Sequence, residues 1–274
     1  MSDSSTVRPT HPTLAEYRAI AQPPEVRSRR SAEHWVADVY LRDISPYLSR
    51  PLVRLGLSAN AVTGLMILSG WAAAGSLLIP GLVGALLAVF FGQLQMLLDC
   101  ADGEVARWRG TFSPAGTFLD KIGHYTAESL IPIALGVRAA GGFGDLDGHY
   151  GWTTLGALLA VLILHNKALN DFVHVSRTFS GLPRLADSAE TAAPRPGLVA
   201  RLRRVARFIP FHRLYHSVEL TLLALVAAIV DIVAGSAWGG LAGTRTLLVV
   251  LLPLALLAVI GHFVTILASS RLRA

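Results

Sequence analysis

The chain has a single cysteine and little charge. Its 274 residues contain only Cys100, so neither an intrachain disulfide nor a metal site built from paired cysteines is possible. Charged residues make up 15% of the sequence, against 53% hydrophobic residues and a mean hydropathy of +0.51. A soluble globular domain carries about 25% charged residues. The composition therefore indicates an integral membrane protein.

The N-terminal segment lacks the apolar core of a secretory signal. Residues 1–30 combine mixed charge with several prolines, and we expect them to form a flexible tail. Residues 31–56 place Trp35, Val39 and Tyr40 among acids and arginines, a pattern typical of an amphipathic helix on the cytoplasmic interface. The membrane domain is then expected over residues 57–274.

Six apolar segments follow, each near the ~20 residues that cross a bilayer. They cover residues 60–79, 82–98, 117–137, 152–170, 217–235 and 246–268. The predicted fold class is therefore an all-α integral membrane protein, with six transmembrane helices and an N-terminal cytoplasmic interfacial helix.

Basic residues gather on one side of these predicted spans. Arginines precede the first span, follow the second as Arg107 and Arg109, fill the fourth loop and end the chain as Arg271 and Arg273. This asymmetry predicts a multi-pass protein of the cell membrane with both termini cytoplasmic. The pI of about 10.0 then reflects this orientation and attraction to anionic membrane lipids. Because the sequence contains no DNA- or RNA-binding motif, we expect no nucleic-acid partner.

Acids gather at the expected cytoplasmic ends of the second and third spans. One helical stripe combines two acids with small residues and an arginine: Asp99, Asp102, Gly103, Ala106 and Arg107. A second stripe, with a member every four residues, follows on the next helix: Gly116, Asp120, His124 and Glu128. Charged groups near the hydrocarbon region are costly, so an acidic cluster indicates a bound cation. Hard divalent ions also accept phosphate oxygens, which implies a diphosphate substrate.

Some polar residues lie outside these stripes. Glu104 is expected to face solvent or lipid headgroups, and Trp108 is expected to anchor its helix at the interface. Arg138 lies at the far end of the third span and is expected to snorkel toward water. The spacing of Lys167 and Asp171 is that of an i,i+4 ion pair.

The pattern DxxDGxxAR, followed after eight residues by GxxxDxxxD, resembles the signature of the CDP-alcohol phosphotransferase (CDP-alcohol phosphatidyltransferase) family. Every fixed position is matched except the last, where His124 replaces the fourth aspartate. The resemblance implies transfer of a phosphoalcohol group from a CDP-linked alcohol or lipid to an alcohol or phosphoalcohol acceptor, with release of CMP. It also implies Mg²⁺ or Mn²⁺ as cofactor, as two ions, and a homodimer.

The same resemblance assigns roles to individual residues. Metal ligands are expected at the acidic positions and at the substituted one: Asp99, Asp102, Asp120 and His124. Nucleotide-binding residues are expected on both halves of the signature and at the start of the first span: Gly103, Ala106, Arg107, Gly116, Asn60 and Thr63. Our interpretation is that His124 serves as general base, with Glu128 one turn further on orienting its ring.

The substitution at position 124 leaves other hypotheses open. The chain is either an active transferase or a catalytically altered or inactive homologue that binds nucleotide. With one carboxylate fewer, the second cation is expected to bind more weakly, or the site to prefer Mn²⁺ over Mg²⁺. An aspartate-rich membrane prenyltransferase also binds diphosphate through Mg²⁺, but that class uses two separate aspartate-rich helices and this chain has one acidic cluster.

Overall fold

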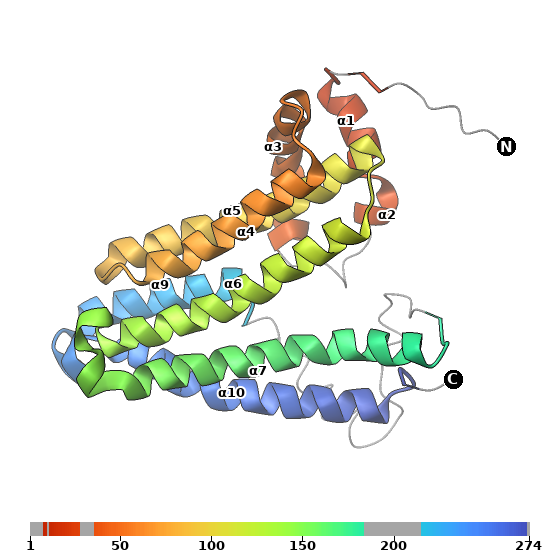
Figure 1. The fold of residues 1–274 in the computed structure, drawn as a ribbon. Coiled ribbons are helices and arrows are strands. Elements are labelled where there is room, and N and C mark those ends of the chain that lie inside the picture. The colour runs from red at the N-terminus through yellow and green to blue at the C-terminus, as the bar shows by residue number, and fades with distance from the viewer. Residues whose placement is uncertain (1–7, 10, 28–35, 184–214, 273–274) are drawn as a thin grey trace. The chain divides into compact units, whose positions relative to one another are not determined.

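The computed structural model describes residues 8–9, 11–27, 36–183 and 215–272, and these contain helices but no strand (Figure 1). The prediction of an all-α protein is confirmed. The chain divides into two compact units, each of which combines segments that are distant in sequence. Unit 1 comprises residues 1–69 and 93–123, and unit 2 comprises residues 70–92 and 124–274.

Unit 1 contains the N-terminal helices and the signature except its last position, His124. Its complete elements are α1 (Leu14–Ala21), α2 (Pro24–Arg27), the π-helical turn η1 (Ala37–Leu41) and α3 (Arg42–Arg54). Three longer helices continue beyond it: α4 (Ala59–Leu77), α5 (Gly81–Arg109) and α6 (Pro114–Ala140). The core of unit 1 is apolar and aromatic, and includes Tyr17, Ala21, Val62, Met66, Leu98, Val105 and Trp108.

The first helix lies within the segment that we expected to be a tail. A capping box starts α1, because the Thr13 hydroxyl accepts from the Glu16 amide while the Glu16 carboxylate accepts from the Thr13 amide. Tyr17 and Ala21, one turn apart, are fully buried, and burial raises the pKa of the Tyr17 phenol above its usual value. The Tyr17 ring packs on Trp108 with centroids 5.2 Å apart. This part of residues 1–30 is therefore an ordered helix.

The expected amphipathic helix over residues 31–56 corresponds to η1 and α3, and its first five residues lie outside the part of the chain described. Along α3, residues four apart share a buried face: Ser45, Ser49 and Val53. Tyr47 lies on the other face and is exposed. The segment is thus amphipathic, and its position at a membrane interface stays a prediction.

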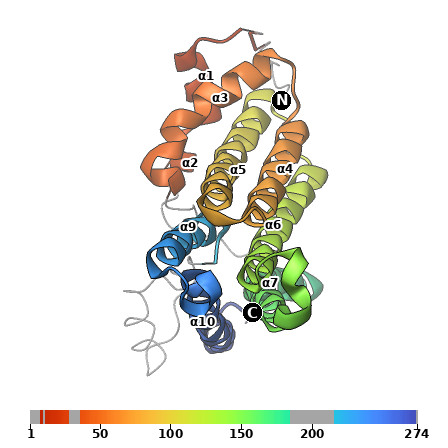
Figure 2. The same cartoon turned by 90° about the vertical axis from the view of Figure 1, so that its left-hand side faces the viewer.

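Unit 2 is built on three further long helices: α7 (Leu146–Phe179), α9 (Ser217–Ala234) and α10 (Ala242–Ala268). Short 3-10 turns, η2 (Phe143–Asp145) and η3 (Ala237–Gly240), precede α7 and α10. Helix α10 packs against both α7 and α9, as Figures 1 and 2 show. The core of unit 2 is mainly aliphatic and includes Leu77, Ile131, Leu135, Leu159, Leu220, Leu248 and Leu251.

Within the described residues, four helices are long and apolar enough to cross a membrane. They are α5, α7 from His149 onward, α9 and α10. This supports four of the six predicted spans and a membrane protein as the class. The segments 60–79 and 117–137 do form helices, α4 and α6, but neither is among these four. Six spans therefore stay a prediction.

Arg138 does not snorkel. Its guanidinium is buried and donates to the carbonyl oxygens of Ile79 at 3.1 Å and Gly81 at 2.7 Å, in the turn between α4 and α5. Nη1 also donates to the carbonyl of Leu77, the last residue of α4, and the last carbonyls of a helix have no partner within that helix. Our expectation for Arg138 was wrong because its partners lie more than fifty residues earlier in the chain.

The α6–α7 crossing depends on two glycines. A Cβ on Gly156 would lie 2.5 Å from the Pro132 carbonyl oxygen and 2.7 Å from the Cα of Gly136. A Cβ on Gly136 would lie 2.9 Å from the Cα of Gly156. Small residues at a crossing allow two backbones to approach closely, a common basis of helix packing in membranes.

We predict that Gly156→Ala lowers the free energy of unfolding by about 1–3 kcal/mol, because the new methyl overlaps backbone that cannot move independently. Gly151→Ala is the matched control on the same helix, since a Cβ there meets no atom within 4 Å. That control should be neutral or stabilising by up to about 1 kcal/mol. Thermal unfolding of both purified variants in detergent measures the difference, and equal effects would contradict the packing argument.

Candidate active site

The signature lies at the facing ends of two helices in unit 1. Its first half is contained in the last three turns of α5, and its second half begins in the first turn of α6. Gly110 ends α5 with a positive φ of 66°, and the Thr111 amide donates to the Ala106 carbonyl. The Ser113 hydroxyl then accepts from the Gly116 amide at 3.0 Å and caps α6. The short loop thus returns the chain directly from one half of the signature to the other.

A cavity of about 500 Å³ opens between these helix ends and the start of α4. Its wall contains most of the residues predicted to bind nucleotide or metal: Asn60, Thr63, Asp102, Gly103, Ala106, Gly116 and Asp120. The remaining wall residues are Ala59, Thr117 and the loop from Thr111 to Pro114. Residues from three helices, distant in sequence, therefore converge on one polar cavity large enough for a small ligand.

Asp102 is oriented by a hydroxyl from another helix. The Thr63 Oγ1 donates to its Oδ2 at 2.6 Å, and Thr63 is buried. This bond fixes one carboxylate oxygen of Asp102 at the cavity wall. Thr63 is therefore a neighbour of the acidic cluster as well as a wall residue, which its position 39 residues earlier did not reveal.

Asp99 and Asp120 bring two carboxylates together. Each offers an oxygen within 4.8 Å of the other, and His124, one turn beyond Asp120 on α6, offers a ring nitrogen within 4.8 Å of Asp120. All three side chains are partly buried. Two carboxylates and an imidazole are a donor set that suits a divalent cation such as Mg²⁺ or Mn²⁺. Asp102 is not part of this group.

The two signature glycines make room for polar groups of the protein itself. A Cβ on Gly116 would lie 3.0 Å from the Asn60 Oδ1, and a Cβ on Gly103 would lie 3.1 Å from the Arg107 Nη1. We expected these glycines to admit nucleotide. In the structure they also let an amide and a guanidinium lie against the backbone at the cavity wall.

Arg107 is not among the residues of the cavity wall. Its Nε donates to the Ala21 carbonyl oxygen at 2.5 Å, while its own carbonyl accepts from the Arg8 Nη1 at 2.6 Å. The residue predicted to bind diphosphate is thus bonded to the N-terminal segment.

Glu104 corrects a second expectation, because it faces neither solvent nor headgroups. Its carboxylate is fully buried and accepts from Gln22 Nε2 at 2.7 Å, from Ser49 Oγ at 2.5 Å and from Ser45 Oγ. Trp108, expected at the membrane interface, is likewise buried, against Tyr17. The sequence does hold one signal, since two serines four residues apart on an amphipathic helix can present hydroxyls to one partner.

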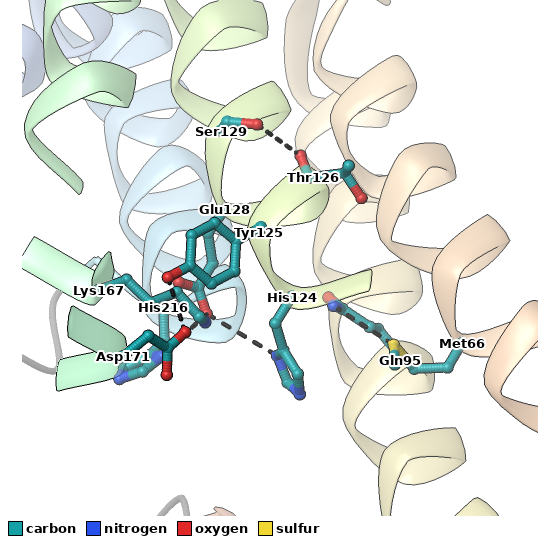
Figure 3. A network of polar contacts seen from close by, with 10 residues as sticks. All are labelled: Met66, Gln95, His124, Tyr125, Thr126, Glu128, Ser129, Lys167, Asp171 and His216. Atoms are coloured by element: carbon teal, nitrogen blue, oxygen red, sulfur yellow. Dashed lines mark hydrogen bonds and ion pairs between the residues drawn. The ribbon is translucent and has the colours of Figure 1, made fainter. Parts of the chain in front are cut away.

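A second buried carboxylate organises unit 2. Glu128 lies 2.8 Å from Lys167 Nζ, 3.2 Å from His216 Nδ1 and 3.9 Å from His124 Nδ1 (Figure 3). The two shorter contacts are hydrogen bonds, whereas 3.9 Å is too long for one. Glu128 is therefore neutralised mainly by Lys167, and its contact with His124 is electrostatic. Lys167 and His216 were not predicted at this position.

Lys167 and Asp171, which have the spacing of an i,i+4 pair, both contact a tyrosine of the neighbouring helix α6. The Tyr125 hydroxyl donates to Asp171 Oδ2 at 2.9 Å, and the Lys167 ammonium lies 5.6 Å from the centre of the Tyr125 ring (Figure 3). Lys167 and Asp171 thus both contact α6, and their pairing with each other stays a prediction. Helical spacing identified the shared face of α7, but it gave no sign that Tyr125 lies opposite that face.

We predict that Lys167→Met destabilises the protein by about 3–5 kcal/mol, because it leaves Glu128 buried with too little compensating charge. The double variant Lys167→Met with Glu128→Leu should recover part of this loss, since it removes both charges. The control is Lys121→Met. Lys121 is the chain's other lysine and is exposed, so this substitution should leave the stability nearly unchanged. Thermal unfolding in detergent measures the stability of all three variants. A double variant less stable than Lys167→Met alone would refute the ion-pair account.

Comparison with known proteins agrees with this arrangement. Residues 57–165 match the family model for CDP-alcohol phosphatidyltransferase. No curated protein matches the chain. The matched range holds α4 from its first residue, both halves of the signature and the cavity wall. Such a domain transfers a phosphoalcohol group from a CDP-alcohol. Residues 57–165 of this membrane protein therefore form a CDP-alcohol phosphatidyltransferase domain.

Proposed function

We propose that the protein transfers a phosphoalcohol, phosphatidyl-type group from a CDP-activated donor to an alcohol acceptor, releases CMP, and serves phospholipid or related polar-lipid synthesis. The observation that carries the proposal is the cavity of about 500 Å³ whose wall unites Asn60 and Thr63 with both halves of the signature. Small residues and polar oxygens in that wall suit a nucleotide diphosphate.

The donor diphosphate carries negative charge and needs cationic partners. Arg107, whose Nη1 faces Gly103 at the cavity wall, can present two parallel N–H donors to phosphate oxygens. The Asn60 amide can donate to the ribose or phosphate, while Thr63, whose hydroxyl proton goes to Asp102, can accept from a ribose hydroxyl. These residues bind and orient the donor without taking part in bond exchange.

Asp99, Asp102 and Asp120, with His124, would hold the divalent cation. A bound Mg²⁺ or Mn²⁺ supplies positive charge to the phosphoryl oxygens during in-line transfer. The carboxylates keep that charge beside the cavity, and the nitrogen ligand favours Mn²⁺ more than an all-oxygen set does. Two ions are the number that we propose.

His124 is the residue that we assign as general base. Its Nδ1 is directed toward Glu128, so Nε2 is the atom that would ligate the cation in the resting site, and it accepts the proton of the acceptor hydroxyl only once it is released from the metal. Glu128 stabilises the resulting imidazolium through space. The acceptor oxygen then attacks the phosphorus distal to cytidine, the bond to the CMP oxygen breaks, and CMP leaves with both bonding electrons.

The substitution at position 124 favours one second candidate, a homologue that binds cytidine nucleotide with altered or no turnover. The prenyltransferase hypothesis has no comparable support, since the described residues hold a single acidic cluster of this kind. In either form, we propose a homodimer in the cell membrane, with both termini and the cavity on the cytoplasmic side.

The test is CMP formation by the purified chain with a panel of CDP-alcohols and acceptors, in Mg²⁺ or Mn²⁺. Wild type should release CMP, and Asp120→Asn should lower the rate by more than the about 10–100-fold typical of outer-shell residues. Asp43→Asn, at an exposed acid of α3, is the matched control and should keep the wild-type rate.

Restoring the fourth acid separates the two candidates. His124→Asp should remain active and use Mg²⁺ more readily, because it returns an oxygen ligand to the site. Cytidine nucleotide binding without CMP formation in wild type would identify the inactive homologue. Binding of neither divalent ion nor cytidine nucleotide would refute both.

A further inference from the structure

Two adjacent residues at the end of helix α1, Ala21 and Gln22, are hydrogen-bonded to the part of α5 that carries the signature. The Gln22 side chain donates to Glu104, and the Ala21 carbonyl accepts from Arg107 Nε at 2.5 Å. Glu104 and Arg107 are three residues apart, one turn of α5. We call this pair of contacts the α1 latch. All four residues belong to unit 1.

The Glu104 side of the latch is rigidly built. The carboxylate is fully buried and accepts hydrogen bonds from Gln22 and from the α3 hydroxyls of Ser45 and Ser49. Gln22 is itself buried and donates to the Arg42 carbonyl as well. Hydrogen bonds to a charged acceptor are roughly twice as strong as neutral ones. The latch therefore fixes where α1 ends relative to α5.

The Arg107 side of the latch lies beside a residue of the cavity wall. Its Nη1 and Nη2 would lie 3.1 and 3.5 Å from a Cβ on Gly103, and Gly103 is part of the cavity wall. Because Nε is held by Ala21, the guanidinium plane cannot swing freely about its long side chain. The bond to α1 thus holds the two Nη groups against the wall residue.

We propose that Gln22 and Glu104 are positioning residues for the nucleotide site: through the Ala21 carbonyl they hold Arg107 ready for the donor diphosphate. This rests on the proposed function. A preorganised arginine loses less conformational freedom on binding, so part of the affinity for nucleotide comes from a helix that makes no contact with it.

The experiment is a double-mutant cycle on CDP binding, measured by titration calorimetry with Mn²⁺ and without turnover. Gln22→Ala should raise the Kd for CDP about 3–10-fold, the effect of one lost hydrogen bond. Arg107→Ala should raise it about 30-fold or more. The double variant should bind no more weakly than Arg107→Ala alone, because Gln22 acts through Arg107.

Two further variants separate positioning from loss of folding. Glu104→Gln keeps the shape of the side chain, weakens the latch and should shift the Kd in the same direction as Gln22→Ala, with turnover at saturating donor less affected than KM. Glu16→Gln loosens the capping box at the other end of α1 and touches neither Glu104 nor Arg107. Its Kd should stay within about 2-fold of wild type, and thermal unfolding of each variant confirms its folding.

The outcomes that overturn the proposal are distinct. Additive effects of Gln22→Ala and Arg107→Ala, or a wild-type Kd in Gln22→Ala, would reduce the latch to a structural contact while the proposed function stands. A wild-type chain that binds no CDP would overturn the latch proposal together with the proposed function.

Discussion

Burial of carboxylates among apolar helices constrains the whole structure, because each one must be neutralised or hydrogen-bonded. Glu128 meets Lys167 and His216, and Asp231 accepts from the amide and hydroxyl of Thr244 at the start of α10. At the signature the situation is reversed, since Asp99 and Asp120 approach within 4.8 Å. Like charges at that distance repel each other, so the arrangement is one that a divalent cation stabilises.

The need to satisfy a buried carboxylate also explains why the N-terminal helices pack on α5. Glu104 lies two residues beyond Asp102 on the same helix, yet its partners are neutral donors from the segments of α1 and α3. By taking hydrogen bonds from Gln22 and the two serines, the carboxylate ties the N-terminal helices to the helix that carries the chemistry. Unit 1 thereby combines a polar cavity with the residues that hold its walls.

Spacing along single helices was a good guide to this chain. The stripe from Asp99 to Arg107 does lie on one helix, and Asp120 does precede His124 by one turn on the next. Most of the residues expected to bind nucleotide or metal line the cavity, and the exceptions are Asp99, Arg107 and His124. The predictions for Glu104, Trp108 and Arg138 were wrong, since all three are buried. Each is polar or amphipathic and lies near a helix end, and for that reason each was expected to face water or headgroups.

The sequence by itself determined the helical class, the faces of the helices and the signature, because all of these follow from the period of one helix and the chemistry of local residue types. Only the tertiary structure decided which groups meet: Gln22 with Glu104 across 82 residues, and His216 with Glu128 across 88. Helical periodicity says which side of a helix a residue occupies. It contains no information about which other helix faces that side, and the partner of a buried charge depends on that.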